Sequence, residues 1–137
     1  MKKGLLALVL CVCLSAPAMA DLFFDDFDSE NGGNYQLNYT GFANWTVSDG
    51  TVDLIGVESL WNWFPAHGLY VDLDGSTGNP GKMLSTEIWL DPGTYTLSFD
   101  LAGNQRNTTA ETVTVEVVVG TFSQTYSLGR DAPFTTF

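Results

Sequence analysis

The residues best suited to ligand chemistry form a short aromatic loop. Trp61, Trp63 and Phe64 stand close together, with Asn62 between the two tryptophans and Pro65 stiffening the chain after them. Aromatic faces stack on the apolar C–H faces of sugar rings, and an amide can bond sugar hydroxyls, so this composition is typical of carbohydrate contact. Rings of this size also dominate core burial. The sequence therefore supports two interpretations, a binding platform and a plug at one end of the fold.

A further candidate ligand contact is Arg106, which follows Asn104 and Gln105 at the end of a predicted strand. Its guanidinium group can donate to a ligand hydroxyl or carboxylate. In the alternative interpretation it is a solvated loop residue.

Two groups of acidic residues could bind calcium, the one cofactor that the sequence suggests. Asp72 and Asp74 point to one side of a predicted strand, and Asp25 with Asp26 begins a second group. Calcium takes carboxylate and carbonyl oxygens, but an EF-hand loop does not match, because position 12 counted from Asp72 is Met83 rather than Glu. Alternatively, these aspartates cap turns by accepting hydrogen bonds from nearby backbone amides.

Catalytic motifs are scarce in this chain. His67 is the single histidine, which excludes a site with several histidine ligands within one chain, and no G-x-S-x-G nucleophile motif accompanies it. The 16 acidic residues offer so many carboxylate pairs that a glycosidase pair would carry no specificity. We predict that the protein is not an enzyme.

The elements that must position these residues show the period-two alternation of half-buried strands. An Asp-Gly pair at Asp49 and Gly50 predicts a hairpin between residues 45–47 and 51–55. Trp45 and Trp89 fall in strand patterns and are expected in the core or on a sheet face. The other predicted strands are residues 22–27, 69–73, 83–90, 95–101, 112–119 and 122–128, the last two paired with each other. The fold class is thus all-β, an antiparallel β-sandwich of about seven strands.

The first twenty residues have the pattern of a cleaved signal peptide. Lys2 and Lys3 precede an apolar run, and Ala18-Met19-Ala20 is a small-residue cleavage site, so the exported domain is expected to span residues 21–137. That domain has no cysteine, and its 3 basic residues against 16 acidic ones give a net charge of −13. Such a charge opposes nucleic-acid binding, and no second apolar segment predicts membrane insertion of the mature chain.

The last residues, 132–137, have the pattern of a strand that is just beginning. We therefore expect the sandwich to be incomplete at its C-terminal end, with closing strands and an anchor missing from the chain.

Several motifs resemble secreted bacterial proteins of the PEP-CTERM and choice-of-anchor groups. They are DDF at residues 25–27, NYTGFANWTVSDGTVDLIG at 38–56, VDLDGS at 71–76 and PGTYTLSFDLAGN at 92–104. The resemblance covers nearly the whole mature chain and implies a galactose-binding-like jelly roll, secreted or displayed at the cell surface. The chain lacks the Pro-Glu-Pro signature, the apolar anchor and the terminal basic cluster of these groups.

Together these observations favour an extracellular module that binds carbohydrate or exopolysaccharide without catalysis. The alternative is a structural protein of the extracellular matrix or cell surface that has no small ligand.

Overall fold

The computed structural model describes residues 22–106, 111–116 and 122–137. The predicted signal peptide and the turn that would join the last two predicted strands lie outside these ranges. The described elements are the 3-10 helix η1 (Glu30–Gly33) and the strands β1 (Trp45–Ser48), β2 (Asp53–Ile55), β3 (Tyr70–Asp72), β4 (Lys82–Ser85), β5 (Asp100–Leu101), β6 (Glu111–Glu116), β7 (Ser123–Leu128) and β8 (Thr135–Thr136). These ranges contain no α-helix, and the paired strands are antiparallel, so the all-β prediction is confirmed. Within them, no helix has the length and apolar character needed to span a membrane.

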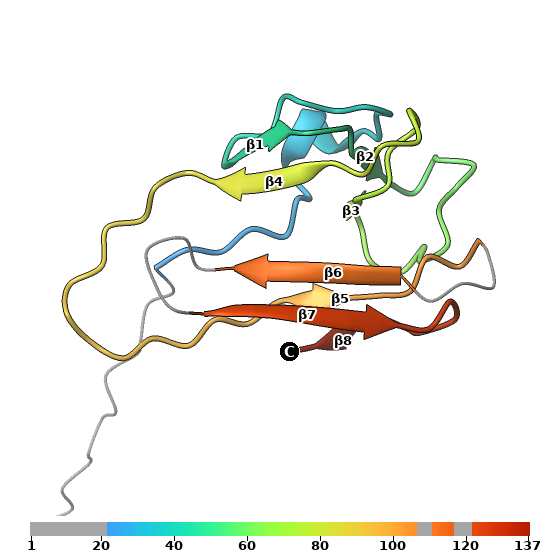
Figure 1. The fold of residues 1–137 in the computed structure, drawn as a ribbon. Helices are drawn as coiled ribbons and strands as arrows, with labels where there is room; N and C mark the ends of the chain where they lie inside the picture. The colour runs from blue at the N-terminus through green and yellow to red at the C-terminus, as the bar shows by residue number, and fades with distance from the viewer. Residues whose placement is uncertain (1–21, 107–110, 117–121) are drawn as a thin grey trace, which may run out of the picture.

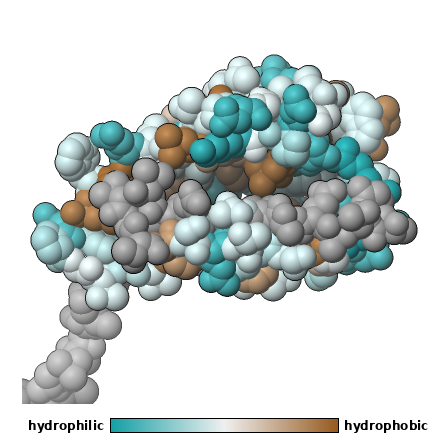
Figure 2. Space-filling view, viewed as in Figure 1, coloured by the Kyte–Doolittle hydropathy of each residue, from teal (hydrophilic) through white to brown (hydrophobic). Residues whose placement is uncertain are grey.

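The strands form four two-stranded ladders that lie in two layers (Figure 1). One layer holds the β1–β4 and β2–β3 ladders together with η1, and the other holds β5–β8 and β6–β7. The predicted pairing of the last two long strands is confirmed by β6 and β7. Apolar side chains gather along the seam between the layers (Figure 2).

The predicted hairpin around Gly50 is wrong, although the turn itself forms. Asp49 adopts φ 56° and Gly50 φ 147°, but β1 pairs with β4 and β2 with β3. The reason is a close approach to the loop before β4: the Thr51 N–H donates to the Asn79 carbonyl at 3.1 Å. A Cβ on Gly50 would lie 2.2 Å from the Pro80 carbonyl oxygen, so this packing requires glycine. The two strands therefore leave the turn toward different partners.

The hydrophobic core belongs to the first layer. Val52 and Leu54 are completely buried, and Tyr39, Phe42 and Leu69 pack with them. All three residues of β2 are buried, which removes the alternation expected of a half-exposed strand. The partly buried rings and aliphatic chains that surround this core include Phe27, Trp45, Val47, Val71, Leu73 and Met83. The expectation that Trp45 packs in the core region is thus confirmed.

A carboxylate lies beside this core. Asp53 is 4% exposed, and its Oδ1 accepts the backbone N–H of Asn38 at 2.7 Å and that of Ser76 at 3.2 Å. Its Oδ2 accepts the Ser76 hydroxyl at 2.7 Å. One buried side chain thereby joins β2 to the loop before β1 and to the loop after β3. Buried carboxylates are tolerated when their oxygens are bonded in this way.

Three predicted strands are wrong in whole or in part. Residues 22–27 form no ladder, and β4 ends at Ser85 rather than residue 90. Of the predicted strand 95–101 only Asp100 and Leu101 form β5, and Phe99 exchanges backbone hydrogen bonds with Phe137 beside it. Between β4 and β5 the chain forms an exposed arch that connects the two layers (Figure 1). Pro92 removes a backbone donor in this arch, and no described strand forms a ladder with it. Trp89 is 90% exposed there, so its expected place in a core or sheet is also wrong.

Among the described residues, Phe134 and Arg106 make side-chain contacts from one layer to the other. Phe134, which precedes β8, packs its ring against His67 and Phe64 of the first layer, with centroid distances of 4.3 and 4.7 Å. Arg106, which follows β5, forms an ion pair with Asp72 at the end of β3. In the described ranges, the layers are therefore joined by the ring contacts of Phe134 and by the ion pair of Arg106.

We expect Asp53→Ala to lower the free energy of unfolding by about 3 kcal/mol, because it leaves buried backbone and hydroxyl donors without an acceptor. Urea denaturation followed by tryptophan fluorescence measures this change. Glu87→Ala is the matched control, since it removes an exposed carboxylate in the arch and should change stability by less than about 0.5 kcal/mol. Equal losses in the two variants would contradict the role assigned to Asp53.

Candidate functional site

The two tryptophans of the aromatic loop are exposed. Trp61 is 44% and Trp63 52% exposed, and neither ring packs against another aromatic ring among the described residues. Their backbones are nevertheless held in place, because the Trp63 N–H donates to the Tyr70 hydroxyl at 3.0 Å and the Trp61 N–H to Ser59 Oγ at 3.2 Å. The loop therefore presents large ring surfaces from an anchored backbone.

Tyr70 of β3 is the main support of this loop. Its hydroxyl accepts from Trp63 and donates to the Trp61 carbonyl at 3.5 Å. Burial raises the pKa of the Tyr70 phenol, and the Asp72 carboxylate raises it further, against the lowering effect of backbone hydrogen bonds and of Arg106. The phenol thus stays protonated at neutral pH and keeps its donor.

Phe64 behaves differently from the tryptophans. Its ring meets Phe134 at 4.7 Å, Tyr70 at 5.7 Å and His67 at 6.3 Å, so it fills the contact between the layers. Each of the two interpretations therefore fits different residues of the same loop. Trp61 and Trp63 have the exposure that a platform needs, and Phe64 has the packing of a plug.

Asn62 shapes the loop from within. Its Oδ1 accepts the Phe64 N–H at 3.0 Å, which closes a tight Asx turn. Its Nδ2 is buried and has no hydrogen-bond partner among the described residues. With the oxygen occupied and the nitrogen enclosed, this amide supports the loop conformation rather than presenting a free group beside the tryptophans.

Arg106 does not lie in the aromatic loop. Gln105 holds its segment in place, since Gln105 Nε2 donates to the Arg130 carbonyl at 2.9 Å and to the Ala132 carbonyl at 3.2 Å. The Arg106 guanidinium then reaches Asp72, the cross-strand neighbour of Asp53. This arginine therefore bonds a carboxylate of its own chain.

The acidic residues proposed for calcium bond mainly within the chain. Asp72 Oδ1 accepts the Asp74 N–H at 3.1 Å while its other oxygen faces Arg106. Asp25 Oδ1 accepts the Phe27 N–H at 2.9 Å, and its Oδ2 accepts Trp45 Nε1 at 2.9 Å. Asp26 Oδ1 accepts the Asp28 N–H at 3.1 Å. The bonds from the N–H groups of Phe27, Asp28 and Asp74 are the turn-capping bonds of the alternative interpretation, whereas Trp45 and Arg106 bond these carboxylates from distant parts of the chain.

The described acidic side chains also do not assemble into a group that could coordinate a metal ion. In the parts of the chain that the structure describes, no three His, Cys, Asp or Glu side chains gather where they could hold a metal ion. Calcium binding by Asp25, Asp26, Asp72 and Asp74 stays an untested prediction.

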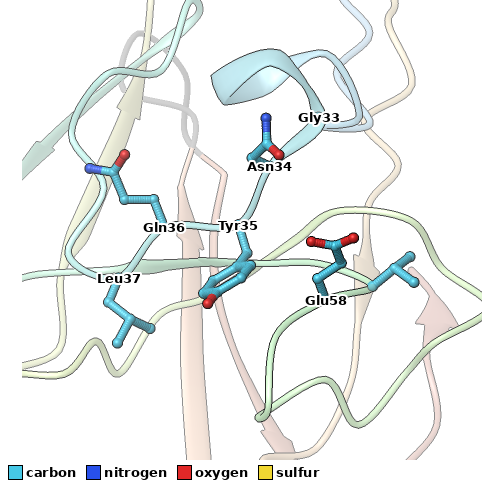
Figure 3. Close-up of a pocket in the computed structure, with 7 residues that line it drawn as sticks. Gly33, Asn34, Tyr35, Gln36, Leu37 and Glu58 are labelled. Atoms are coloured by element: carbon cyan, nitrogen blue, oxygen red, sulfur yellow. The ribbon is translucent and has the colours of Figure 1, made fainter.

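Sequence reasoning missed a surface hollow of about 630 Å³ beside the core. It is lined by Gly33, Asn34, Tyr35, Gln36, Leu37, Val57 and Glu58. The Glu58 carboxylate lies to one side of the Tyr35 ring, while Asn34 and Gln36 extend from the opposite side of the same segment (Figure 3). In the sequence, the one sign of this hollow was a tyrosine between two amide residues, Asn34 and Gln36. The proximity of Glu58 to that tyrosine follows only from the fold.

Comparisons with family models, with curated proteins and with solved structures found no match to this chain. The resemblance to PEP-CTERM and choice-of-anchor proteins therefore stays a prediction.

The pKa of Asp72 gives a test of the contact between the layers. Burial raises this pKa, as do the Asp53 and Asp74 carboxylates, while the Asp74 N–H and the Arg106 guanidinium oppose the rise. Because the folded pKa lies above the unfolded value of about 3.9, the contribution of Asp72 to stability is fully present below that value and is lost as pH rises through the folded pKa.

We expect Arg106→Gln to raise the Asp72 pKa further, because the variant removes the nearby cation. The side-chain carboxyl carbon shift of Asp72, followed against pH by NMR, measures it, and Arg130→Gln is the control because Arg130 pairs with Asp131 instead. An unchanged or lowered Asp72 pKa in Arg106→Gln would show that the ion pair is not formed in solution.

Proposed function

We propose that this protein is an exported, non-catalytic carbohydrate-binding module that uses Trp61 and Trp63 as its platform. The observation that carries the proposal is the exposure of both rings, 44% and 52%, on a backbone anchored by Tyr70 and Ser59. An indole face left open to water on an anchored loop loses little conformational freedom on binding a sugar ring. It gains from stacking on the C–H face of that ring.

The neighbouring contacts also support this proposal. Phe64 is held between Phe134 and Tyr70, which fixes the end of the loop without covering the tryptophans. Leu60 is 90% exposed beside them and extends the apolar surface. A long polysaccharide suits such an open site better than a small molecule that needs enclosure.

We further propose that the two layers are those of a jelly-roll sandwich of the galactose-binding type, and that the signal peptide directs the domain to the cell surface or the extracellular matrix. The two-layer arrangement of antiparallel ladders supports the first part (Figure 1). The pattern of residues 1–20 and the cysteine-free, acidic remainder support the second.

A structural role in the extracellular matrix is the second candidate, favoured by the arch between β4 and β5. Along this unpaired stretch Trp89 is 90% exposed, and Ile88, Leu90, Tyr95 and Leu97 are each 41–50% exposed. An extended segment with free backbone groups and apolar side chains is a place where another chain can add.

We expect the double variant Trp61→Ala/Trp63→Ala to lower retention on an extracellular polysaccharide about tenfold, which corresponds to about 1.4 kcal/mol. Its thermal midpoint should stay near that of the unaltered protein, since the two rings are not in the core. Affinity electrophoresis in polysaccharide gels and thermal unfolding measure the two effects.

Trp89→Ala is the matched control, because it removes an equally large exposed ring from another part of the chain. It should leave retention unchanged. A double variant that melts several degrees lower while its retention is intact would assign the tryptophans to packing and refute the platform.

For the structural role, we expect the sedimentation coefficient of residues 21–137 to rise with protein concentration in salt high enough to screen their net charge of −13. Trp89→Ser should reduce this association, because it removes the most exposed ring of the arch. A protein that sediments as a monomer at every concentration and salt level would exclude self-assembly through the arch.

A further inference from the structure

The hollow beside η1 is supported by a well-fixed segment. Gln36 and Leu54 exchange both backbone hydrogen bonds at 2.9 Å, and Leu54 is completely buried. Upstream, Asn31 Nδ2 donates to the Asn34 carbonyl at 3.0 Å, and Asn34 Nδ2 donates to the Asn31 carbonyl at 3.2 Å. These two bonds close the turn around Gly32. The segment that carries Tyr35 is thus tied to the core on one side and to a closed turn on the other.

The open side of the hollow presents an aromatic ring and a carboxylate. Tyr35 is 40% exposed, and Glu58 is exposed without a hydrogen bond or ion pair to any residue in 22–106, 111–116 or 122–137. The carboxylates of Asp25, Asp26 and Asp72 each accept a backbone N–H, and Asp72 also pairs with Arg106, whereas neither Glu58 oxygen accepts such a bond in the described ranges.

This combination selects a cation. The face of a tyrosine ring attracts an ammonium group, and a carboxylate beside the ring adds a direct ion pair. The excess of 16 acidic over 5 basic residues raises the local concentration of cations at the surface. Neutral or anionic groups gain neither contact.

We propose that this hollow binds the protonated amino group of an amino sugar, with the ring of Tyr35 beneath the ammonium and Glu58 paired with it. Asn34 and Gln36 belong to the same lining; the Asn34 amide nitrogen is bonded to the Asn31 and Gly32 carbonyls, so the Gln36 amide is the group that can bond a sugar hydroxyl. The volume of about 630 Å³ is in the range of small-molecule sites.

The hollow and the tryptophan platform belong to one stretch of chain. Glu58 precedes Trp61 by three residues, so their Cα atoms are at most about 11 Å apart. A short oligosaccharide can span that distance. The sugar identity of the ligand rests on the proposed function, whereas the ammonium contact rests on the hollow alone.

The test is an NMR titration of the purified protein with two tetrasaccharides, one of glucosamine and one of N-acetylglucosamine. We expect the glucosamine probe to shift the amides of residues 33–37, 57 and 58. The acetylated probe, which has no ammonium, should leave them in place. Spermidine, an ammonium compound without sugar, distinguishes an amino-sugar site from a general ammonium site: binding as tight as that of the glucosamine probe would overturn the amino-sugar assignment.

Matched variants separate a site from general charge attraction. Glu58→Gln and Tyr35→Leu should each weaken binding of the glucosamine probe about fivefold. Tyr35→Phe, which keeps the ring, should retain binding. Glu87→Gln, which removes an equal charge from the arch, should weaken it less than about twofold. Equal effects of Glu58→Gln and Glu87→Gln, or an acetylated probe that binds as tightly, would overturn the proposal.

The outcome is independent of the tryptophan test. Loss of polysaccharide retention in Trp61→Ala/Trp63→Ala with no response of the hollow to the glucosamine probe refutes the hollow alone. A response of the hollow that depends on Glu58, without any retention by the tryptophans, supports the ammonium site and refutes the platform.

Discussion

The first layer depends on the hydrogen bonds that the buried Asp53 carboxylate accepts from two loops. Asp53 lies on the central buried strand β2 and accepts three hydrogen bonds from segments far away in sequence. Because an apolar side chain at this position would leave those donors unpaired in a buried place, packing alone cannot replace it. The carboxylate also lies opposite Asp72 in the β2–β3 register and raises the pKa of that residue. Asp53 thus links the core to the ion pair that joins the two layers.

The contact between the layers explains how one loop can serve two purposes. Phe134 reaches the first layer through Phe64 and His67, so part of the aromatic loop is needed to hold the β5–β8 side of the molecule in place. Phe64 is held in that contact, while the turn from Asn62 to Phe64 and the backbone bonds to Ser59 and Tyr70 hold Trp61 and Trp63 at the surface. Their exposure is therefore a consequence of how the loop is anchored. An open binding surface then forms without a separate supporting element.

The all-β class was predictable from the sequence because alternation and turn residues are local signals. Strand partners were not. Asp49 and Gly50 make the expected turn, but Gly50 packs against the Pro80 carbonyl, and that contact separates β1 from β2. The alternation in residues 95–101 was equally clear, yet a strand needs a partner, and among the described residues the ladder covers only Asp100 and Leu101, with Phe99 bonded to Phe137 beside it. For the site, the sequence identified the rings of the aromatic loop but left open whether they are exposed or packed, and the placement of Glu58 beside Tyr35 depends on a fold that brings two loops together.

The distribution of negative charge distinguishes residues that hold the fold from those available to a ligand. Glu30 is 5% exposed and accepts the Ala43 N–H at 2.9 Å, and Asp28 accepts the Leu69 N–H at 2.7 Å, so these carboxylates act as acceptors for backbone amides across loops. A chain with loops this long needs such acceptors, because its short ladders pair few of its backbone groups. Once those carboxylates are assigned to the fold, the excess negative charge that remains exposed is free to act on partners. Glu58 is then significant for its position beside an aromatic ring, and the same charge placed on the arch would attract cations without selecting among them.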